Sequence, residues 1–120
     1  MTEERERAAR PEDITRLFVE RANAKDVDGL VALYEPDAVL GFPPGQITMG
    51  REAIRAVYER MLAQDLTFKQ ETPLPTLYFG DNLALTATPA SDEAGARAQV
   101  VRPQPDGTWL RILDRPDFRP

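Results

Sequence analysis

The segment at positions 21–40 constrains the fold of this chain more than any other. It contains the end of one predicted helix and then a short second helix, for which Asp26 is a suitable N-cap. Pro36 is expected to end the second helix, because a residue that precedes proline avoids helical dihedral angles. A strand is expected at positions 38–42. The segment therefore predicts two consecutive helices that lead directly into a sheet.

Apolar residues at helical spacing predict three helices in the first half of the chain. Pro11 starts the first, since proline is favoured in the first helical turn, and Gly50 precedes the third. The predicted inner faces comprise Ile14, Leu17, Phe18, Arg21 and Ala22, then Val27, Leu30, Val31 and Tyr34, then Ile54, Val57, Tyr58, Met61 and Leu62.

The second half of the chain is typical of strands separated by turns. Strands are expected at positions 66–77, 83–89, 96–102 and 109–114, and positions 46–49 can return as a hairpin beside the first strand. Turns are expected at positions 80–82, 91–95 and 105–107. Prolines at 73 and 75 indicate a bulged or edge strand. Helices followed by hairpins predict an α+β fold in which the sheet curls around the helices and leaves a cone-shaped pocket.

The chain contains no histidine and no cysteine, which excludes several kinds of site. Disulfides and thiolate nucleophiles need cysteine, and a Ser-His-Asp triad or a typical zinc site needs histidine. Acid–base chemistry would then fall to carboxylates, tyrosine, lysine or water. We expect neither a metal nor a cofactor.

Charge and length bound the partners and the location. The net charge of −5 disfavours nucleic acid and anionic membranes as partners. No apolar run approaches the roughly 18 residues of a membrane span, and the charged N-terminus does not resemble a secretory signal, so a cytoplasmic location is expected. One domain is expected at 11–120, after a charged arm at 1–10. Arginine supplies 13 of the 15 basic residues, which suggests a GC-rich bacterial genome.

Three segments carry a family resemblance: positions 21–40, Gly50-Arg-Glu-Ala-Ile-Arg55 and Asp106-Gly-Thr-Trp-Leu-Arg-Ile-Leu-Asp114. Together they resemble the SnoaL-like, ketosteroid-isomerase-like branch of the nuclear-transport-factor-2-like superfamily. The resemblance covers roughly residues 12–116. It implies a cone-shaped α+β barrel, in which three N-terminal helices pack on a strongly curved, mixed but mostly antiparallel sheet. It also implies a small-molecule pocket and a homodimer.

The resemblance also locates the positions that carry chemistry in ketosteroid isomerases. The base carboxylate falls on Phe42, the oxyanion-hole tyrosine on Phe18 and the oxyanion-hole acid on Gln99. All three differ from the family pattern, so steroid isomerisation is not expected. The pocket should instead prefer an apolar or weakly acidic small molecule. Gln99 could still donate a hydrogen bond to a carbonyl oxygen.

Asp114 is the main candidate for acid–base catalysis. Strand alternation places Leu110, Ile112 and Asp114 on one face, taken as the pocket lining. The last strand also resembles that of limonene-epoxide-hydrolase-like members, where the matching aspartate acts in acid–base catalysis. The Arg-x-Asp that those members carry on an earlier strand is missing here. Two interpretations stay open: Asp114 is a pocket acid–base group, or it ends the strand and pairs with Arg97, Arg115 or a helix.

The remaining candidates also carry two interpretations each. Arg97 either binds a ligand or is an exposed strand arginine. Tyr34 and Tyr58 are either core residues or pocket donors. Trp109 is expected on the outer face of the sheet, either at a dimer interface or in ordinary packing. The predicted function is a cofactor-independent isomerase, cyclase or hydratase-type enzyme that uses a buried carboxylate. The alternative is a non-catalytic ligand-binding or dimerisation domain of the same fold.

Overall fold

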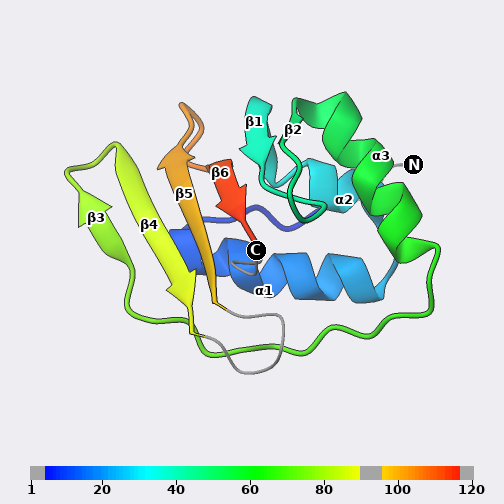
Figure 1. Cartoon of the computed structure of the whole chain (residues 1–120). Coiled ribbons are helices and arrows are strands. Elements are labelled where there is room, and N and C mark those ends of the chain that lie inside the picture. Colours follow the sequence, from blue (N-terminus) through cyan, green and yellow to red (C-terminus); the bar gives the residue numbers. More distant parts are fainter. Residues whose placement is uncertain (1–4, 90–95, 117–120) are drawn as a thin grey trace.

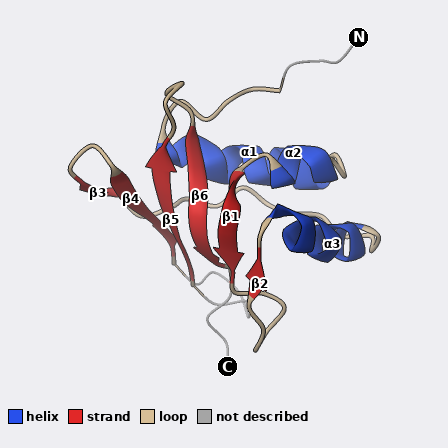
Figure 2. Cartoon of the chain, turned by 90° about the horizontal axis from the view of Figure 1, so that it is seen from above, coloured by secondary structure: helices blue, strands red, loops and turns tan. Residues whose placement is uncertain are grey.

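A computed structural model describes residues 5–89 and 96–116. Three helices cover one face of a curved six-stranded sheet (Figures 1 and 2). The elements are α1 (Pro11–Asn23), α2 (Val27–Val31), β1 (Tyr34–Leu40), β2 (Thr48–Met49), α3 (Arg51–Leu62), β3 (Leu77–Phe79), β4 (Leu83–Thr88), β5 (Arg97–Pro103) and β6 (Trp109–Arg115). The α+β class is confirmed.

The strand order is β2-β1-β6-β5-β4-β3. Only β1 and β6 pair in parallel, and the other neighbouring strands are antiparallel. The sheet is therefore mixed and mostly antiparallel, as expected. It is curved but does not close into a barrel, because β2 and β3 remain its two edges.

The helices begin and end where local chemistry favours it. Pro11 occupies the first turn of α1. The Asp26 carboxylate caps α2 by accepting a hydrogen bond from the Gly29 N–H at 3.0 Å. A β-carbon at Gly29 would lie 2.1 Å from an Asp26 carboxylate oxygen, so the cap requires glycine there. Within the described residues, no helix is both long and apolar enough to cross a membrane.

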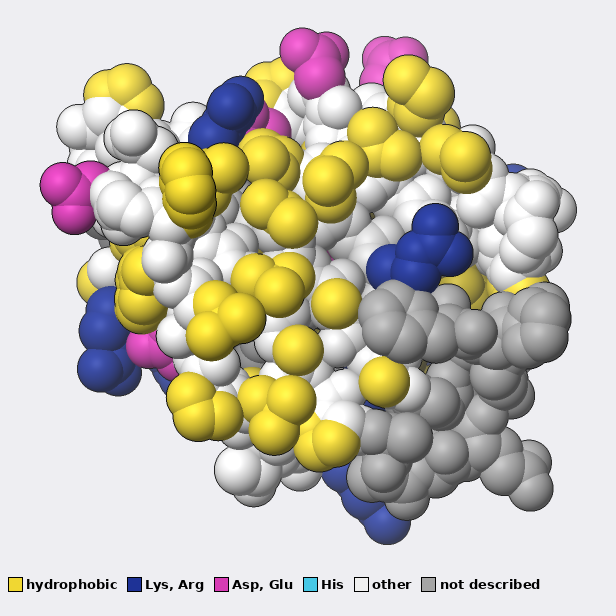
Figure 3. All heavy atoms as spheres, turned by 60° about the vertical axis from the view of Figure 1, so that its left-hand side comes forward, with side chains coloured by type: hydrophobic (Ala, Val, Ile, Leu, Met, Phe, Trp, Pro, Cys, Tyr) yellow, Lys and Arg dark blue, Asp and Glu magenta, His cyan; other side chains and the backbone are white. Residues whose placement is uncertain are grey.

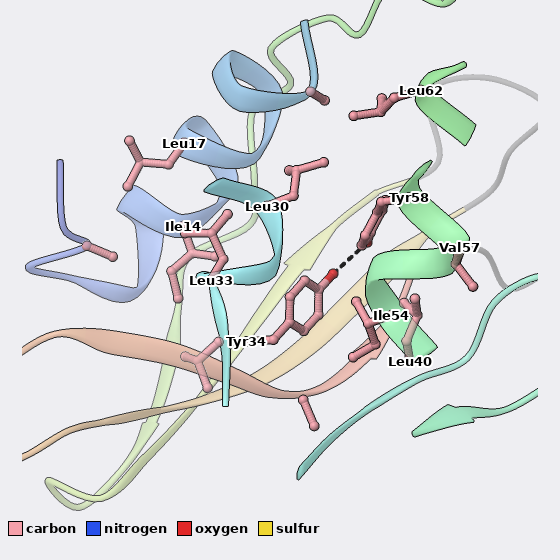
Figure 4. Packing of buried hydrophobic residues seen from close by; sticks show 14 of the residues in the cluster. Ile14, Leu17, Leu30, Leu33, Tyr34, Leu40, Ile54, Val57, Tyr58 and Leu62 are labelled. Carbon is pink, nitrogen blue, oxygen red and sulfur yellow. Dashed lines mark hydrogen bonds between the residues drawn. The ribbon is translucent and has the colours of Figure 1, made fainter. Parts of the chain in front are cut away.

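Apolar side chains from all three helices meet the inner face of the sheet in one core (Figure 4). The predicted stripes supply most of it. Ile14, Leu30 and Ile54 are fully buried, one from each helix. Tyr34 is also fully buried, but it belongs to β1, where it pairs with Arg111, and not to the second helix as predicted. The second helix ends at Val31, before Pro36 is reached.

Two other expectations about strands need correction. Positions 66–76 form no strand, and only β3 remains of that prediction, at the edge of the sheet. Pro36 lies inside β1 and does not precede it. There the register of β1 against β6 shifts between Tyr34 and Val39, so regular pairing does not require an N–H from Pro36. The predicted turn at 91–95 lies outside the described residues.

A bulge in β6 overturns the predicted faces of that strand. Val100 lies opposite Leu113 and Val101 lies opposite Arg111, which leaves Ile112 as an extra residue. Alternation therefore breaks at Ile112. Arg111 shares the helix-covered face with Asp114, whereas Leu113 is 49% exposed on the other face.

Trp109 is likewise on the helix-covered side, two residues before Arg111. It is half-buried and packs against the core. Its ring meets that of Tyr78 edge-on, with 6.2 Å between centroids. The prediction that Trp109 faces the outer side of the sheet is therefore wrong.

Candidate functional site

Asp114 lies at the centre of a buried polar cluster built from three strands. Tyr34 Oη on β1 donates to Asp114 Oδ2 at 2.5 Å, and Gln99 Nε2 on β5 donates to Oδ1 at 3.1 Å. Arg111 Nη1, on the same strand as Asp114, lies 3.3 Å from Oδ2. The Asp114 side chain is 1% exposed and that of Arg111 is 5% exposed. This carboxylate is thus held by three donors inside the protein.

The antiparallel register explains how Gln99 is oriented. Thr86, Gln99 and Asp114 lie opposite one another on β4, β5 and β6. Thr86 Oγ1 donates to Gln99 Oε1 at 2.8 Å. Since the amide oxygen is engaged by Thr86, the amide nitrogen faces the carboxylate.

The third helix adds a second phenol to the cluster. Tyr58 on α3 and Tyr34 point toward one another, with their hydroxyl oxygens 2.6 Å apart (Figure 4). Each hydroxyl carries one proton. Because Tyr34 donates its proton to Asp114, Tyr58 donates to Tyr34. The result is a chain of hydrogen bonds from Tyr58 through Tyr34 to Asp114.

Burial governs the protonation of both phenols. Desolvation raises the pKa of Tyr34 well above its ordinary value, and the charge of Asp114 raises it further. The pKa of Tyr58 is raised by the same two causes, in the same order. Both tyrosines are therefore neutral hydrogen-bond donors at neutral pH. In the cluster, only Asp114 and Arg111 carry charge.

Arg111 is stabilised as a cation within this buried site. Burial lowers the pKa of its guanidinium, but the Asp114 carboxylate and the two phenols outweigh burial and raise it overall. The guanidinium carbon lies 5.1 Å from the centroid of the Phe18 ring and 5.8 Å from that of Tyr34. Its Nε is buried and has no hydrogen-bond partner within the described residues.

Aromatic rings connect the cluster to the segment that follows α3. The Phe18 ring meets Tyr58 and Phe68 edge-on, at centroid distances of 5.8 and 6.2 Å. Asn23 holds Phe68 in place, because its amide accepts from the Phe68 N–H at 2.8 Å and donates to the Phe68 carbonyl at 2.9 Å. A ligand can reach Asp114 only when neighbouring side chains move.

Two clefts lie elsewhere on the surface. One, of about 510 Å³, lies between residues 5–8, the end of α2 and the turn before β6. The other, of about 390 Å³, is lined by Glu12, Tyr78 and residues 73–76. Neither is lined by Asp114. In the part of the chain that the structure describes, no group of three or more acidic side chains converges as a metal site would require.

The family model described as SnoaL-like domain matches residues 15–114, which is most of the chain. The chain belongs to the SnoaL-like domain family. A search of curated proteins finds no match for this SnoaL-like domain.

Solved structures share the fold at low sequence identity. A putative calcium/calmodulin-dependent protein kinase type II association domain from Thiobacillus denitrificans is 18% identical, with a TM-score of 0.73 over 92% of this chain and 96% of that one. A ketosteroid isomerase-like protein from Erwinia carotovora atroseptica is also 18% identical, with a TM-score of 0.67 over 91% and 94%. A putative dehydratase of the NTF2-like family from Streptomyces avermitilis is 17% identical, with a TM-score of 0.65 over 87% and 90%.

The SnoaL-like domain brings five of the residues singled out in the sequence into one group of contacts. Asp114 contacts Gln99 and Tyr34, and Tyr34 contacts Tyr58. Phe18 lies beside Tyr58. Gln99 occupies the face predicted for it.

The other singled-out residues lie away from the Asp114 carboxylate. Arg97 forms a partly buried ion pair with Glu71, so the structure does not pair it with Asp114. Phe42 is half-buried against the core. Leu110 and Ile112 are half-buried, and the bulge separates both from the face that carries Asp114. They do not line the cluster as expected.

Sequence reasoning missed Arg111, Thr86 and Phe68. Simple alternation along the last strand places Arg111 on the face opposite Asp114, so Arg111 was not considered for the site. No residue type near Ile112 signals the bulge. Thr86 could have been found, since it stands on the inner face of a strand whose pairing with the Gln99 strand was expected. Phe68 lies in a segment for which a strand was predicted, so its contact with Phe18 had no local signal.

Proposed function

We propose that this SnoaL-like domain is a cofactor-independent enzyme that binds a small molecule and moves a proton with Asp114. The class of reaction is that of isomerases, cyclases and hydratases. The observation that carries the proposal is the buried cluster of Asp114, Arg111 and Tyr34. Removing two charges from water is costly, and apolar residues of similar size often serve stability as well or better. A buried charged pair in a small core is therefore better explained by function than by stability.

The proposed chemistry needs a base and donors around one ligand. The Asp114 carboxylate would accept a proton from a carbon next to a carbonyl group and return it to another carbon of the same molecule. Arg111 and the phenols would stabilise the negative charge that develops on the carbonyl oxygen. Gln99 would hold the carboxylate in place. No group outside the chain and its substrate is required for the proton balance.

The non-catalytic alternative also has an observation in its favour. Three donors already bond the Asp114 carboxylate, and the positive charge of Arg111 balances its negative charge. The cluster is therefore electrically neutral and hydrogen-bonded without a ligand. A domain that only binds a ligand or dimerises needs no more than this. The neighbours named as ketosteroid isomerase-like and putative dehydratase are under 25% identical and support the fold alone.

Proton exchange separates the two functions. Small carbonyl compounds such as 2-cyclohexenone and acetophenone would be incubated with the protein in D₂O, and loss of their α-proton signals followed by NMR. The enzyme should accelerate exchange, and Asp114→Asn should slow it by about 10²-fold or more. Asp37→Asn, at an exposed carboxylate on β1, is the matched control. Ligand binding without exchange above the buffer rate would favour the non-catalytic function.

We also propose that the domain is a homodimer through the face of the sheet opposite the helices. A continuous row of apolar residues crosses all six strands in register on that face: Met49, Val39, Leu113, Val100, Leu85 and Leu77. Figure 3 shows hydrophobic side chains gathered across the sheet on this side of the molecule. A broad exposed apolar surface on a small domain marks an interaction site. In a two-fold dimer, the same row of apolar residues on a second copy would pack against it.

A further inference from the structure

One of the two surface clefts combines positive charge with an apolar wall. This cleft of about 510 Å³, which we call the arm cleft, is lined by residues 5–8, by Arg21 of α1, by Ala32 and Leu33 after α2, and by the turn and strand that include Asp106, Trp109 and Leu110. Its volume suits a small organic molecule. The combination of arginines with apolar side chains points to a ligand that has both a charge and an apolar part.

Arg21 is the buried cation of the arm cleft. The residue is 9% exposed. Its Nη1 donates to the Gly29 carbonyl oxygen at 2.8 Å, and its Nη2 donates to the Glu6 carbonyl oxygen. Both acceptors are neutral, and within the described residues Arg21 forms no ion pair with a carboxylate. Because arginine keeps its proton in proteins, the cleft holds a positive charge that no bonded side chain balances.

The other charged side chains of the arm cleft are already paired. The pairs are Arg5 with Asp26, Arg7 with Asp106, and Glu6 with Arg16. Burial has the largest effect on the pKa of the Arg21 guanidinium and lowers it, and the charge of Asp26 offsets this only in part. Burial of a cation is unfavourable unless an anion pairs with it. An anion bound in the cleft would therefore be stabilised by Arg21 more than by the paired arginines.

The charges around Arg21 favour a ligand with a single negative charge. Glu6 and Asp106 also line the arm cleft, and their own cationic partners are already engaged. A second negative charge on the ligand would therefore be repelled by these carboxylates. A carboxylate carries one charge, and its two oxygens match the planar N–H groups of a guanidinium.

The apolar wall of the arm cleft is fixed by the backbone. The Trp109 N–H donates to the Ala8 carbonyl oxygen at 2.9 Å, which ties residues 5–8 to β6. Trp109 and Leu110 are only half-buried, so part of each side chain stays accessible in the cleft. The flat face of an indole ring favours contact with an aromatic or unsaturated group.

We propose that the arm cleft binds a small monocarboxylate, with the ligand's carboxylate on Arg21 and its flat apolar part against Trp109 and Leu110. This site is separate from that of the proposed function, since Asp114 does not line the cleft. The domain would then have two sites of different chemistry, the Asp114 cluster inside the core and an anion-selective cleft at the surface. Failure of either proposal would leave the other intact.

Trp109 gives the test a direct readout, because it is the only tryptophan of the chain. Phenylacetate, phenylacetamide and phenyl phosphate share a benzene ring and carry, at mildly alkaline pH, one negative charge, no charge and two negative charges. Each would be titrated into the wild-type protein by tryptophan fluorescence and by calorimetry. Phenylacetate should change the Trp109 fluorescence with saturation. The amide and the phosphate should bind at least about tenfold more weakly.

Two variants locate the bound probe. Arg21→Met keeps an unbranched side chain without the charge, and its affinity for phenylacetate should fall about tenfold, to that of phenylacetamide. Ala32 lines the cleft at an exposed position, so Ala32→Phe should fill the cleft, keep the fold and also weaken binding about tenfold. Ala53→Phe is the matched control, because Ala53 is exposed on α3 and does not line the cleft. The Ala32→Phe result is decisive even where Arg21→Met does not fold.

Four results would overturn the proposal. Phenylacetamide could bind as tightly as phenylacetate, which would mean that the charge of Arg21 is not used. Phenyl phosphate could bind more tightly, which would reject a site for a single negative charge. Phenylacetate could bind Ala32→Phe and the wild type equally, which would place it outside the arm cleft. Phenylacetate could also fail to bind the wild type at millimolar concentration, which would reject the site itself.

Discussion

Tyr34 donates its phenolic proton to Asp114 across 80 positions of sequence, with 2.5 Å between the two oxygens. The parallel pairing of β1 with β6 makes this contact possible, because it brings the first strand in the sequence beside the last one. Both side chains lie under the helices, where neither can exchange its partner for water. The hydrogen bond therefore contributes to stability as well as to the candidate site.

Removal of the Tyr34 hydroxyl should destabilise the fold. Tyr34→Phe leaves a buried carboxylate with one donor fewer, so the free energy of unfolding should fall by about 1–3 kcal/mol. Tyr58→Phe should cost less, because Asp114 then keeps the hydrogen bond from Tyr34. Urea denaturation would measure both changes. Tyr78→Phe is the control: its hydroxyl is at the surface, and a loss there equal to that of Tyr34→Phe would contradict the prediction.

The Asp114–Arg111 pair should be costly to break and less costly to replace. Asp114→Asn leaves Arg111 as an unpaired buried cation and should lower the free energy of unfolding by about 3 kcal/mol or more. The double variant Arg111→Met with Asp114→Leu removes both charges and should recover at least part of that loss. Thermal and urea unfolding would compare the two. A double variant less stable than Asp114→Asn would show that the pair is stabilising in itself.

Alkaline pH should weaken the fold through the two buried phenols. Their pKa values in the folded protein lie above the ordinary phenol value of about 10. Below about pH 10, the folded and the unfolded protein both keep these phenolic protons, so the stability of the fold does not change with pH through these two groups. Above it the unfolded chain releases protons that the folded chain retains, so stability falls as pH rises toward the folded pKa values.

Absorbance at 295 nm would follow tyrosinate formation alongside circular dichroism. Ionisation of Tyr34 and Tyr58 should coincide with unfolding. Tyr58→Phe should make the loss of stability above about pH 10 less steep, because one of the two groups is gone. Ionisation of both tyrosines in a protein that stays folded at pH 10 would argue against this prediction.

A charge in the apolar row should prevent association. Leu113 stands near the middle of the row, so Leu113→Glu places a carboxylate in the proposed interface and opposite its symmetry mate. Light scattering should give about twice the 13.5 kDa chain mass for the wild type and the single mass for the variant. Lys69→Glu, at an exposed position outside the sheet, should leave the dimer intact. A monomeric wild type would remove the homodimer proposal.

The sequence by itself determined the helices, the order of the strands along the chain and the family. The stripes containing Ile14 and Ile54 repeat at helical spacing, and Asp26 marks the start of a helix through contacts within three residues. The shared face of Gln99 and Val101 followed from simple alternation in an uninterrupted stretch. These features depend on near neighbours, so a local pattern predicts them.

Only the tertiary structure decided which charges meet. Alternation separates Arg111 from Asp114, but the pairing of β6 with β5 leaves Ile112 unpaired and returns both side chains to the buried face. The tertiary structure also places Tyr34 on a strand rather than a helix, and it pairs Arg97 with Glu71 in an ion pair. A bulge moves side chains by one register position, and that shift is set by the neighbouring strands. The residues of β6 alone therefore carry no sign of it.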